Sequence, residues 1–487
     1  MMEANPNSPQ SALPLVVDLD GTLIKTDLLF ESANQFITRH PFRLATLLKW
    51  LTQGKSYLKA QLAQDYSIDA TSLPYNRNLI SWLSEERQQG RKIILATASH
   101  KLLAEAVANH LGLFDEVVAT EGDINLKANK KRDLLISKYG DRGFDYIGND
   151  AADFPVWKAA NAAYLVSSSA SFINRVGIIS NLTKIFPSDQ PSFIKPLLKA
   201  LRPHQWIKNI LLFIPIFAAH QFNDSSSVKN VFIAFLVFGI TASSVYVLND
   251  LIDISDDRHH HRKQLRPFAA GNLSLLVGWL LWPILLIFAF TIAVLTLPIT
   301  FTAVLLLYFI CTLSYSLKLK QIAILDVLIL AGLYTLRIIA GGEAIGAPLS
   351  FWLLTFSMYI FLSLALIKRY SELALISKVG KDGRIKGRGY IKSDLKLVSS
   401  IGIGSGLLSV LVLALYVQDS RAAALYHTPQ WMWLVCPILL FWICRAWLIT
   451  HRGQMHDDPI VFAIKDKMSL YIGGFLLGLY VLASIRI

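Results

Sequence analysis

Hydrophobic positions are distributed unevenly along the chain. Up to about residue 195 they occur in short runs between polar segments, whereas from Trp206 onward long apolar runs are separated by short polar loops. An apolar run of about twenty residues is long enough to cross the hydrocarbon core of a membrane. The pattern therefore predicts a soluble unit followed by a polytopic membrane unit.

Nine apolar runs approach this length and are predicted to be membrane helices, at about residues 205–222, 229–249, 273–296, 299–316, 322–345, 350–368, 396–417, 430–449 and 468–486. Lysine and arginine are concentrated in the loops after the even-numbered helices. The positive-inside rule places these loops and the N-terminal unit in the cytoplasm, and an odd number of helices places the C-terminus outside.

The N-terminal unit contains three predicted buried strands that each end in polar residues: 15–17 before Asp18 and Asp20, 92–96 before Thr97, and 144–147 before Asn149, Asp150 and Asp153. Ligands bind at the carboxyl ends of strands in an open α/β sheet. An aspartate there can attack phosphorus, and a second one two residues on can donate a proton to the leaving oxygen. These strands predict a phosphoryl-transfer site.

Two further segments of this unit have a helical or mixed pattern. Residues 28–87 are mostly helical, and their basic residues form a solvated face, which we favour, or lie on an anionic bilayer: Arg39, Arg43, Lys49, Lys55 and Lys59. Residues 171–195 are expected to be a linker between a domain at 13–170 and a membrane domain at 196–487. An amphipathic part of the linker, near 172–185, lies on the membrane surface or is a plain tether.

The stretch after the second predicted membrane helix is dense in carboxylates. If the helix continues past Asn249, then Asp250, Asp253 and Asp257 fall at i, i+3 and i+7 on one face. Three carboxylates that converge repel one another unless a cation lies among them, and hard oxygen ligands suit Mg²⁺, which usually binds a substrate phosphate as well. The stretch predicts a magnesium–diphosphate site, with a solvated helix cap as the alternative.

Basic residues gather on the same predicted side of the membrane: Lys208, His260, Lys263, Arg266, Lys318, Arg337, Lys368 and Arg369. Arginine is suited to bidentate phosphate binding. For the loop cations the alternative is a purely topological role. For Arg337, in the middle of a predicted helix, the alternative is a buried structural ion pair.

Composition adds little that changes this interpretation. The formal net charge is +13, which suits cytoplasmic loops and anionic lipid or phosphate substrates. The sequence has no basic patch interleaved with aromatic residues, so no nucleic-acid partner is expected. The three cysteines lie in apolar runs and do not predict a disulfide framework or a zinc site.

The N-terminal motifs, taken in order, resemble those of the haloacid dehalogenase (HAD) phosphatase superfamily. The resemblance implies a Rossmannoid α/β domain with a small helical cap, in which Asp18 is the nucleophile, Asp20 the acid/base and Thr97 a donor to phosphoryl oxygen. Lys131 matches the lysine of the third motif, although Lys127 and Lys130 compete for that role.

The fourth HAD motif departs from its usual form. Asn149 stands where the first metal-binding aspartate is expected, adjacent Asp150 could substitute for it, and Asp153 matches the second aspartate. The resemblance implies a Mg²⁺ ion held by these residues together with Asp18 and Asp20.

The membrane unit resembles the UbiA superfamily of intramembrane prenyltransferases, through its nine predicted helices and the Asn249–Asp257 motif. Lys368 and Arg369 stand where aromatic prenyltransferases carry a second aspartate-rich motif. Together with the motifs at Arg202–Asn209 and Asp257–Pro267, this change resembles the decaprenyl-phosphate phosphoribosyltransferase branch. The resemblance implies a nine-helix bundle in a bacterial cytoplasmic membrane.

That branch transfers 5-phosphoribose from phosphoribosyl pyrophosphate (PRPP) to a polyprenyl phosphate and releases diphosphate. We expect Mg²⁺ on Asp250, Asp253 and Asp257 to neutralise the leaving diphosphate. The fused phosphatase is then expected to remove the 5-phosphate. Two alternatives stay open: an aromatic prenyltransferase fused to a phosphatase with a separate substrate, and a membrane anchor or transporter that displays a phosphatase.

Overall fold

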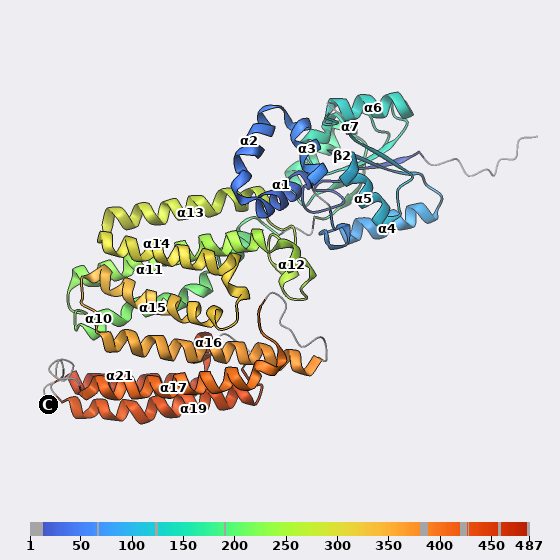
Figure 1. Ribbon diagram of the computed structural model, residues 1–487. Coiled ribbons are helices and arrows are strands. Elements are labelled where there is room, and N and C mark those ends of the chain that lie inside the picture. The colour runs from blue at the N-terminus through green and yellow to red at the C-terminus, as the bar shows by residue number, and fades with distance from the viewer. Residues whose placement is uncertain are drawn as a thin grey trace, which may run out of the picture. The chain divides into compact units, whose positions relative to one another are not determined.

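The computed structural model describes residues 13–65, 68–121, 125–188, 191–379, 388–418, 426, 428–455 and 459–484. The chain forms two compact units, of which the first comprises Met1–Leu201 with Tyr246–Trp282 and the second Arg202–Val245 with Pro283–Ile487 (Figure 1). Helices α11 (Ser225–Ile252) and α13 (Leu275–Thr296) contribute residues to both units.

The first unit is built on a parallel sheet of β1 (Leu15–Val17), β2 (Ile93–His100), β3 (Glu116–Thr120), β4 (Asp145–Gly148), β5 (Ala163–Val166) and β6 (Leu182–Phe186). Their order is β3-β2-β1-β4-β5-β6. In this order β1 is central, and Val16 pairs with Ile94 of β2 and with Tyr146 of β4. The carboxyl ends of the three strands therefore lie side by side, where the sequence predicts the phosphoryl-transfer site.

Helices cover both faces of the sheet: α4 (Arg77–Gln88) and α5 (Lys101–Leu111) on one, and α6 (Asn129–Tyr139), α7 (Phe154–Ala159) and α8 (Ala170–Ile179) on the other. Side chains of β1 alternate between these faces, because successive residues of a strand point in opposite directions. Leu15 and Val17 pack with α4 and α5, whereas Val16 packs with α6 and α7. The prediction of an N-terminal α/β domain with a parallel sheet is confirmed.

The segment expected to be a linker belongs to this domain instead. Residues 171–195 include most of α8 and all of β6, which pairs in parallel with β5. Val176 of α8 is fully buried in the apolar cluster on that face of the sheet. Polar and serine-rich stretches around a short strand made the segment look like a tether, but tertiary pairing orders it.

The cap consists of α1 (Leu28–Arg39), α2 (Leu44–Thr52) and α3 (Lys55–Asp65), with η1 (Pro41–Arg43) between the first two. Phe36, Leu58 and Leu62 form its core. A solvated basic face describes α2 only in part, because Leu44, Leu48 and Leu51 are exposed as well. The short helices η2 (Ala70–Ser72) and η3 (Ala151–Asp153) complete the loops of the domain.

The first unit also contains the end of α11, followed by α12 (Ile254–His259) and η5 (Lys263–Leu265), and α9 (Ile194–Leu201). A separate apolar cluster holds these pieces together: Ala200, Val247, Leu251, Ile254, Phe268, Leu273 and Leu275. We call residues 249–266 the aspartate-rich segment.

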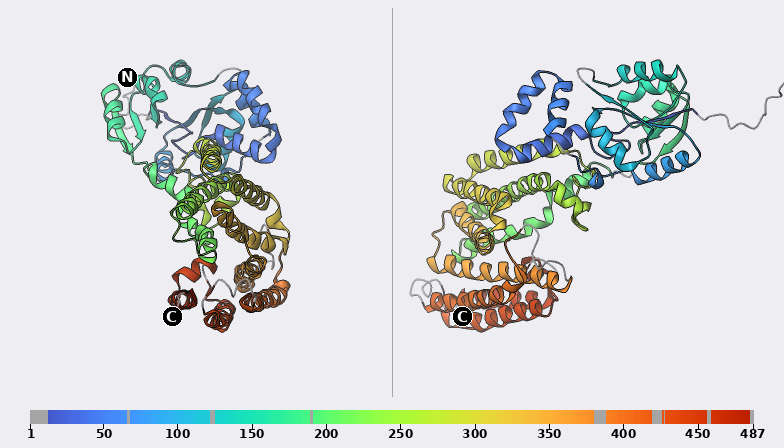
Figure 2. Two further views of the ribbon diagram at one scale, coloured as in Figure 1. Left: turned by 90° about the vertical axis from the view of Figure 1, so that its left-hand side faces the viewer. Right: turned by 45° about the vertical axis from the view of Figure 1, so that its right-hand side comes forward.

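In the part of the chain that the structure describes, eight helices are long and apolar enough to cross a membrane: α11, α13, α14 (Ile299–Leu317), α15 (Leu325–Ile345), α16 (Phe351–Val379), α17 (Leu395–Gln418), α19 (Val435–His451, preceded by η8, Pro429–Leu434) and α21 (Lys467–Ser484). Several of those in the second unit run nearly parallel or antiparallel and are seen end-on in the left view of Figure 2. The shorter elements are η6 (Leu319–Gln321), η7 (Lys392–Asp394) and α20 (Pro459–Lys465).

The predicted count of nine spanning helices is not confirmed. The first predicted span, residues 205–222, corresponds to η4 (Pro203–Phe213) and the five-residue α10 (Ile214–Ala218). Arg202 before it has a positive φ of 51°. A Cβ at Gly341 of α15 would collide with the backbone of Leu212, so η4 lies directly on that helix. Its apolar residue Leu212 is fully buried in the second unit.

Candidate active sites

The first site lies at the carboxyl end of β1. The Asp18 carboxylate receives a hydrogen bond from Lys131 Nζ on Oδ1 at 2.7 Å and one from Thr22 Oγ1 on Oδ2 at 3.2 Å. Thr22 also lies 3.0 Å from Asn149 Oδ1, which follows β4. Gly21 has φ 78°, and a Cβ there would collide with the Asn149 side chain. The loop therefore brings a carboxylate and an amide oxygen to the same hydroxyl group.

Lys131, at the start of α6, is the buried member of the three candidate lysines. Lys127 and Lys130 are exposed, whereas Lys131 is 4% exposed. Its Nζ also donates to Tyr146 Oη at 3.0 Å and lies 3.7 Å from Asp153 Oδ1. Burial alone would lower the pKa of Lys131, but its position beside Asp18 and Asp153 raises it above its ordinary value. Burial raises the pKa of Asp18 to about 7, against the opposing effect of Lys131.

Asp20 is held by three donors. Its Oδ2 accepts hydrogen bonds from Thr97 Oγ1 at 3.1 Å and Ser99 Oγ at 2.7 Å, and its Oδ1 accepts from the Leu28 backbone at 2.9 Å. Thr97, expected to face a phosphoryl oxygen, donates to Asp20 here. The carboxylate of Asp20 is thus fixed between the end of β2 and the first turn of the cap.

The fourth-motif residues occupy different roles. Asp153 accepts hydrogen bonds on Oδ2 from the backbones of Asn149 and Asp150 and on Oδ1 from Tyr146 Oη at 2.7 Å. Asp150 is exposed and caps η3 through Ala151. Asp153 therefore shapes the loop, while Asp18 and Asn149 present the oxygens that best suit a hard cation.

Sequence patterns did not single out Lys59 or Asp27 as site residues. Lys59 of α3 donates to the Ala98 carbonyl at 2.6 Å and to Asn125 Oδ1 at 3.2 Å, so it points into the sheet domain and is not part of a solvated face. Burial lowers its pKa. Asp27 caps α1, and burial followed by the charge of Asp20 raises its pKa to about 6. Both residues come from the cap, whose fold brings them to the site.

The second site is the aspartate-rich segment. The long helix ends at Ile252 and restarts at Ile254, so Asp253 sits at a break and not within one continuous helix as expected. Backbone hydrogen bonds from Asp253 to Asn249 and from Asp257 to Asp253 nevertheless keep helical spacing across it. Asp250 and Asp257 therefore stay close to each other, as their shared contact with Arg266 shows.

Arg266 joins the two buried carboxylates. Its Nη1 lies 3.1 Å from Asp250 Oδ1 and 2.6 Å from Asp257 Oδ2, and the two aspartates are 2% and 1% exposed. One positive charge thus permits two carboxylates to approach in a buried place. Burial raises the pKa of Asp257 to about 6, opposed by Arg266.

The donor set of this segment fits a divalent cation. Asn249 Oδ1 and Asp257 Oδ1 are buried acceptors that receive no hydrogen bond from the described residues. Buried oxygens are rarely left without a partner, which can be a water molecule, an ion or a ligand. Among the described residues, however, no group of three His, Cys, Asp or Glu side chains converges closely enough to hold a metal. The fit therefore rests on Asn249 and Asp257 with Asp250.

The remaining cations of this segment are more open. Lys263 Nζ lies 4.0 Å from Asp257 Oδ1, and its side chain is 45% exposed. His260 is exposed, and its Nδ1 accepts hydrogen bonds from the backbones of Arg262 and Lys263. Both side chains can reach an anion in solvent.

Arg337 is a buried candidate cation that has no carboxylate partner among the described residues. Its Nε donates to Asn209 Oδ1 at 3.0 Å, its Nη1 to the Leu333 carbonyl at 2.6 Å and its Nη2 to Tyr308 Oη at 2.9 Å. The guanidinium also lies against Tyr308 and Tyr334, and Lys208 Nζ lies 5.9 Å from the Tyr334 ring. Among the described residues, polar groups and aromatic rings surround Arg337, in place of the structural ion pair that was the alternative for it.

Arg369 has different surroundings from those expected of a free phosphate ligand. It is fully buried, and it pairs with Asp326 at 2.7 Å and with Glu372. Arg388 and Tyr390 also bind Asp326. Lys368 next to it is half-buried, and Lys318 is exposed. The Arg369 charge thus neutralises carboxylates of the chain itself.

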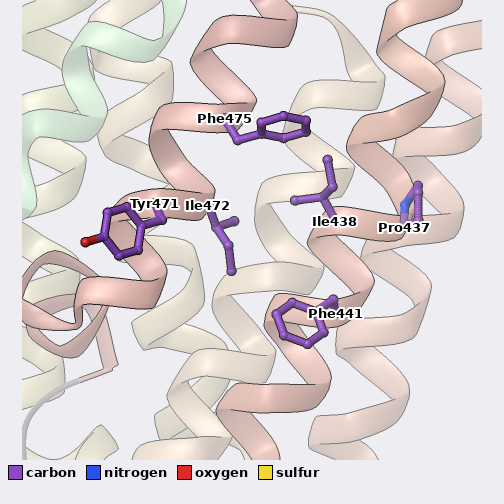
Figure 3. Close-up of a pocket in the computed structure, with 6 residues that line it drawn as sticks. All are labelled: Pro437, Ile438, Phe441, Tyr471, Ile472 and Phe475. Carbon is purple, nitrogen blue, oxygen red and sulfur yellow. The ribbon is translucent and has the colours of Figure 1, made fainter.

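The second unit also contains an apolar groove between α19 and α21, with a volume of about 460 Å³. Figure 3 shows its lining residues: Pro437, Ile438, Phe441, Tyr471, Ile472 and Phe475. Apart from the Tyr471 hydroxyl its lining is apolar, which suits lipid hydrocarbon.

Comparison with known families divides the chain as the sequence motifs do. The profile of the "UbiA prenyltransferase family" matches residues 210–472. The profile of the "haloacid dehalogenase-like hydrolase" family matches residues 15–155.

Three relatives are similar over different lengths. Uncharacterized protein y4nM of Sinorhizobium fredii is 37% identical over 97% of this chain and 91% of that one. Nodulation protein NoeC of Azorhizobium caulinodans is 36% identical over 59% of this chain and 93% of that protein. Decaprenyl-phosphate phosphoribosyltransferase of Mycobacterium tuberculosis is 32% identical over 57% of this chain and 90% of the enzyme.

Proposed function

The chain belongs to the UbiA prenyltransferase family and carries a HAD-like hydrolase domain at its N-terminus, and on this basis we propose that it is a bifunctional enzyme of lipid glycosylation. The membrane unit transfers 5-phosphoribose from PRPP to a polyprenyl phosphate such as decaprenyl phosphate. The HAD domain then removes the 5-phosphate to give polyprenyl-phosphoryl-ribose. The similarity to decaprenyl-phosphate phosphoribosyltransferases supports the first step.

The observation that carries the proposal is the balance of charge in the second unit. Asp326 and Glu372 are already paired with Arg369 and Arg388, so they are poor ligands for a second metal. Arg337 by contrast is 6% exposed and has no carboxylate partner among the described residues. A buried cation of this kind is stabilised by an anion, and a phosphate group of a substrate supplies one.

The transferase step breaks the bond between ribose C1 and the diphosphate oxygen and forms a bond from C1 to an oxygen of the acceptor phosphate. In this proposal Asn249, Asp250 and Asp257 would hold Mg²⁺, which would neutralise charge on the leaving diphosphate. Asp253, close to them in the sequence, is a further proposed ligand. The acceptor phosphate is already ionised, so the step needs no general base.

In this proposal each unit supplies cations that bind phosphate groups of the substrates. Lys208 and Arg337 lie near Tyr334 in the second unit, and we assign them to phosphate binding with Lys318 and Lys368. His260, Lys263 and Arg266 provide positive charge on the aspartate-rich segment. Arg369 then acts indirectly, because it fixes Asp326 and the end of α16 and does not contact phosphate.

In the phosphatase step Asp18 attacks the phosphorus of the 5-phosphate ester, and the ester oxygen leaves with a proton from Asp20. Water, deprotonated by Asp20, then releases inorganic phosphate from Asp18. Lys131 neutralises Asp18 and the incoming phosphate, and Thr97 holds Asp20 or a phosphoryl oxygen. Asp18 and Asn149 would hold Mg²⁺, which would supply positive charge at the transferred phosphoryl group.

The proposed setting is the cytoplasmic membrane of a bacterium, with both sites on the cytoplasmic side. PRPP is soluble while the polyprenyl tail lies in the bilayer, so the transferase site belongs at the cytoplasmic ends of the membrane helices. The basic loops favour this orientation. The eight candidate spans of the described residues establish a multi-pass membrane protein without its direction.

The donor assay tests the transferase step. The full chain in lipid nanodiscs is given PRPP and polyprenyl phosphate, or polyprenyl diphosphate with a neutral aromatic acceptor, and released diphosphate is measured. Diphosphate release from PRPP, lost in Asp257→Ala, is the expected result. Release only from the prenyl donor would instead indicate an aromatic prenyltransferase, and activity that is unchanged in Asp257→Ala would remove the aspartate-rich segment from the mechanism.

A further inference from the structure

The cap helix α1 of the HAD domain contacts the aspartate-rich segment within the same compact unit. The contacts come from Phe30, Glu31 and Asn34, which lie on adjacent turns of α1. The HAD mechanism proposed above uses none of these three side chains. Their purpose therefore calls for an explanation outside the phosphatase reaction.

Glu31 and Arg258 form a buried two-point ion pair. Glu31 Oε1 accepts from Arg258 Nη2 at 2.6 Å and Oε2 from Nη1 at 3.1 Å, and the side chains are 3% and 6% exposed. Thr26 Oγ1 donates to Glu31 Oε1 at 2.7 Å. A buried bidentate pair fixes geometry more tightly than a surface pair, because each charge depends on the other.

Arg258 contacts both Glu31 and the loop that follows the aspartate-rich segment. It directly follows Asp257, and its Nε donates to the Ala269 carbonyl at 3.1 Å, three residues beyond Arg266. Arg266 in turn joins Asp257 to Asp250. Glu31 is thus linked through Arg258 to the helix that carries Asp257 and, through the Ala269 carbonyl, to the loop that follows Arg266.

Asn34 binds the segment at the break between the two helices. Its Nδ2 donates to the Leu251 carbonyl at 3.0 Å, and its Oδ1 accepts from Trp279 Nε1 at 2.9 Å. Leu251 lies in the last turn of α11, where carbonyl groups lack helical partners. Asn34 therefore satisfies a carbonyl adjacent to Asp250 and helps to fix where the helix ends.

Apolar packing and a close backbone approach complete the contact. Phe30 packs on the cluster that contains Leu251 and Phe268. A Cβ at Gly271, whose φ is 69°, would collide with Lys25 and touch Pro74 of the HAD domain. The loop after Arg266 is therefore shaped to lie against this domain.

We propose that Glu31 and Asn34 are positioning residues of the transferase, so that the cap of the phosphatase domain is a structural part of the site formed by Asp250 and Asp257. The proposal rests on the proposed function, because it assigns these residues to the transferase reaction. It also gives a second reason for the fusion of the two domains. In addition to hydrolysing the product of the transferase, the phosphatase domain holds the aspartate-rich segment in place.

Steady-state assays of the full chain in nanodiscs test the proposal. Glu31→Gln keeps the shape of the side chain but leaves the Arg258 charge unbalanced. We expect at least a tenfold rise in the Mg²⁺ concentration for half-maximal transferase activity and a tenfold fall in kcat/KM for PRPP. Hydrolysis of p-nitrophenyl phosphate by the HAD domain should stay within twofold, which shows that the variant is folded. Asn34→Ala is expected to act in the same direction.

Glu116→Gln is the matched control. Like Glu31→Gln, it removes the charge of a glutamate that forms ion pairs in the same domain, but the partners of Glu116 are surface lysines outside the aspartate-rich segment. The combination Glu31→Arg with Arg258→Glu should recover part of the activity that each single change removes. Transferase kinetics of Glu31→Gln equal to those of Glu116→Gln would overturn the proposal.

Hydrogen exchange separates this inference from the transferase assignment. This measurement needs no substrate: the backbone amides of residues 249–266 should exchange faster in Glu31→Gln than in Glu116→Gln. If the wild type does not use PRPP but this difference is found, the proposed function fails while the structural coupling stands. Equal exchange rates in the two variants would contradict the proposed structural coupling between Glu31 and residues 249–266.

Discussion

Lys131 balances the charges of a buried group of acids. Its ammonium lies 2.7 Å from Asp18 and 3.7 Å from Asp153, and the removal of one member of a buried pair leaves the other uncompensated. Lys131→Met is therefore expected to abolish hydrolysis of phosphate esters and to destabilise the HAD domain by about 3 kcal/mol. Thermal unfolding followed by fluorescence checks the stability, with exposed Lys130→Met as the control.

The addition of Asp18→Asn to Lys131→Met should recover most of this stability without recovery of activity, because it removes the uncompensated charge. Equal stability of Lys131→Met and Lys130→Met would show that the pair contributes little to the fold.

Asp257 gives the transferase an expected dependence on pH. Burial raises its pKa from 3.8 to about 6, and only the ionised carboxylate binds a cation well. Above about pH 6 the group is ionised, whereas below it protons compete with Mg²⁺. The Mg²⁺ concentration for half-maximal activity should therefore rise between pH 7.5 and pH 5.5, approaching tenfold per unit at the lower end. A flat Mg²⁺ requirement over this range would contradict a ligand role for Asp257.

At the residue scale, the motifs predicted which side chains gather at the end of the sheet, but they did not predict every residue that contacts them. Asp18, Asp20, Thr97 and Lys131 lie together because each stands at a strand end or helix start that the apolar pattern reveals. Lys59 reaches the same place from the cap, through a tertiary contact that no local pattern encodes. The pairing of Arg369 with Asp326, 43 residues apart in sequence, could not be anticipated for the same reason.

Two glycines of α15 provide a test at the scale of elements. A Cβ at Gly341 would collide with the Leu212 backbone of η4, whereas nothing lies within 4 Å of a Cβ at Gly332. Gly341→Ala should displace η4, which carries Lys208 and Asn209, and reduce transferase activity at least tenfold. Gly332→Ala should leave activity unchanged, because alanine is well tolerated in a helix. Product formation in nanodiscs distinguishes the two.

Apolar run length located eight of the predicted helices, and the first predicted span is not confirmed. The predicted run at 299–316 is α14 at Ile299–Leu317, because its composition and length alone require a helix in hydrocarbon. The run at 205–222, which contains Lys208 and Asn209, folds as η4 and α10, and Leu212 of η4 packs against Gly341 of α15. Residues 182–186 likewise became a strand only through pairing with β5. For residues 205–222 and 182–186, tertiary contacts therefore determine the secondary structure.

At the scale of the whole molecule, the two proposed reactions share one chain and one lipid. The product of the transferase would carry a phosphate monoester that the HAD domain can hydrolyse. Tethering raises the effective concentration of one site for the product of the other. The y4nM relative, similar over 97% of this chain, spans both parts.

The central claim is tested most directly with doubly labelled PRPP, carrying ¹⁴C in the ribose and ³²P in the 5-phosphate. The purified full chain in nanodiscs is incubated with this PRPP, Mg²⁺ and polyprenyl phosphate, and the lipid is extracted. The wild type should yield a lipid that contains ¹⁴C but not ³²P, with ³²P released as inorganic phosphate, and Asp18→Asn should yield a lipid that contains both in equal amounts. A lipid fraction without ¹⁴C would contradict the transferase step, and equal ³²P in the lipids of both proteins would contradict the phosphatase step.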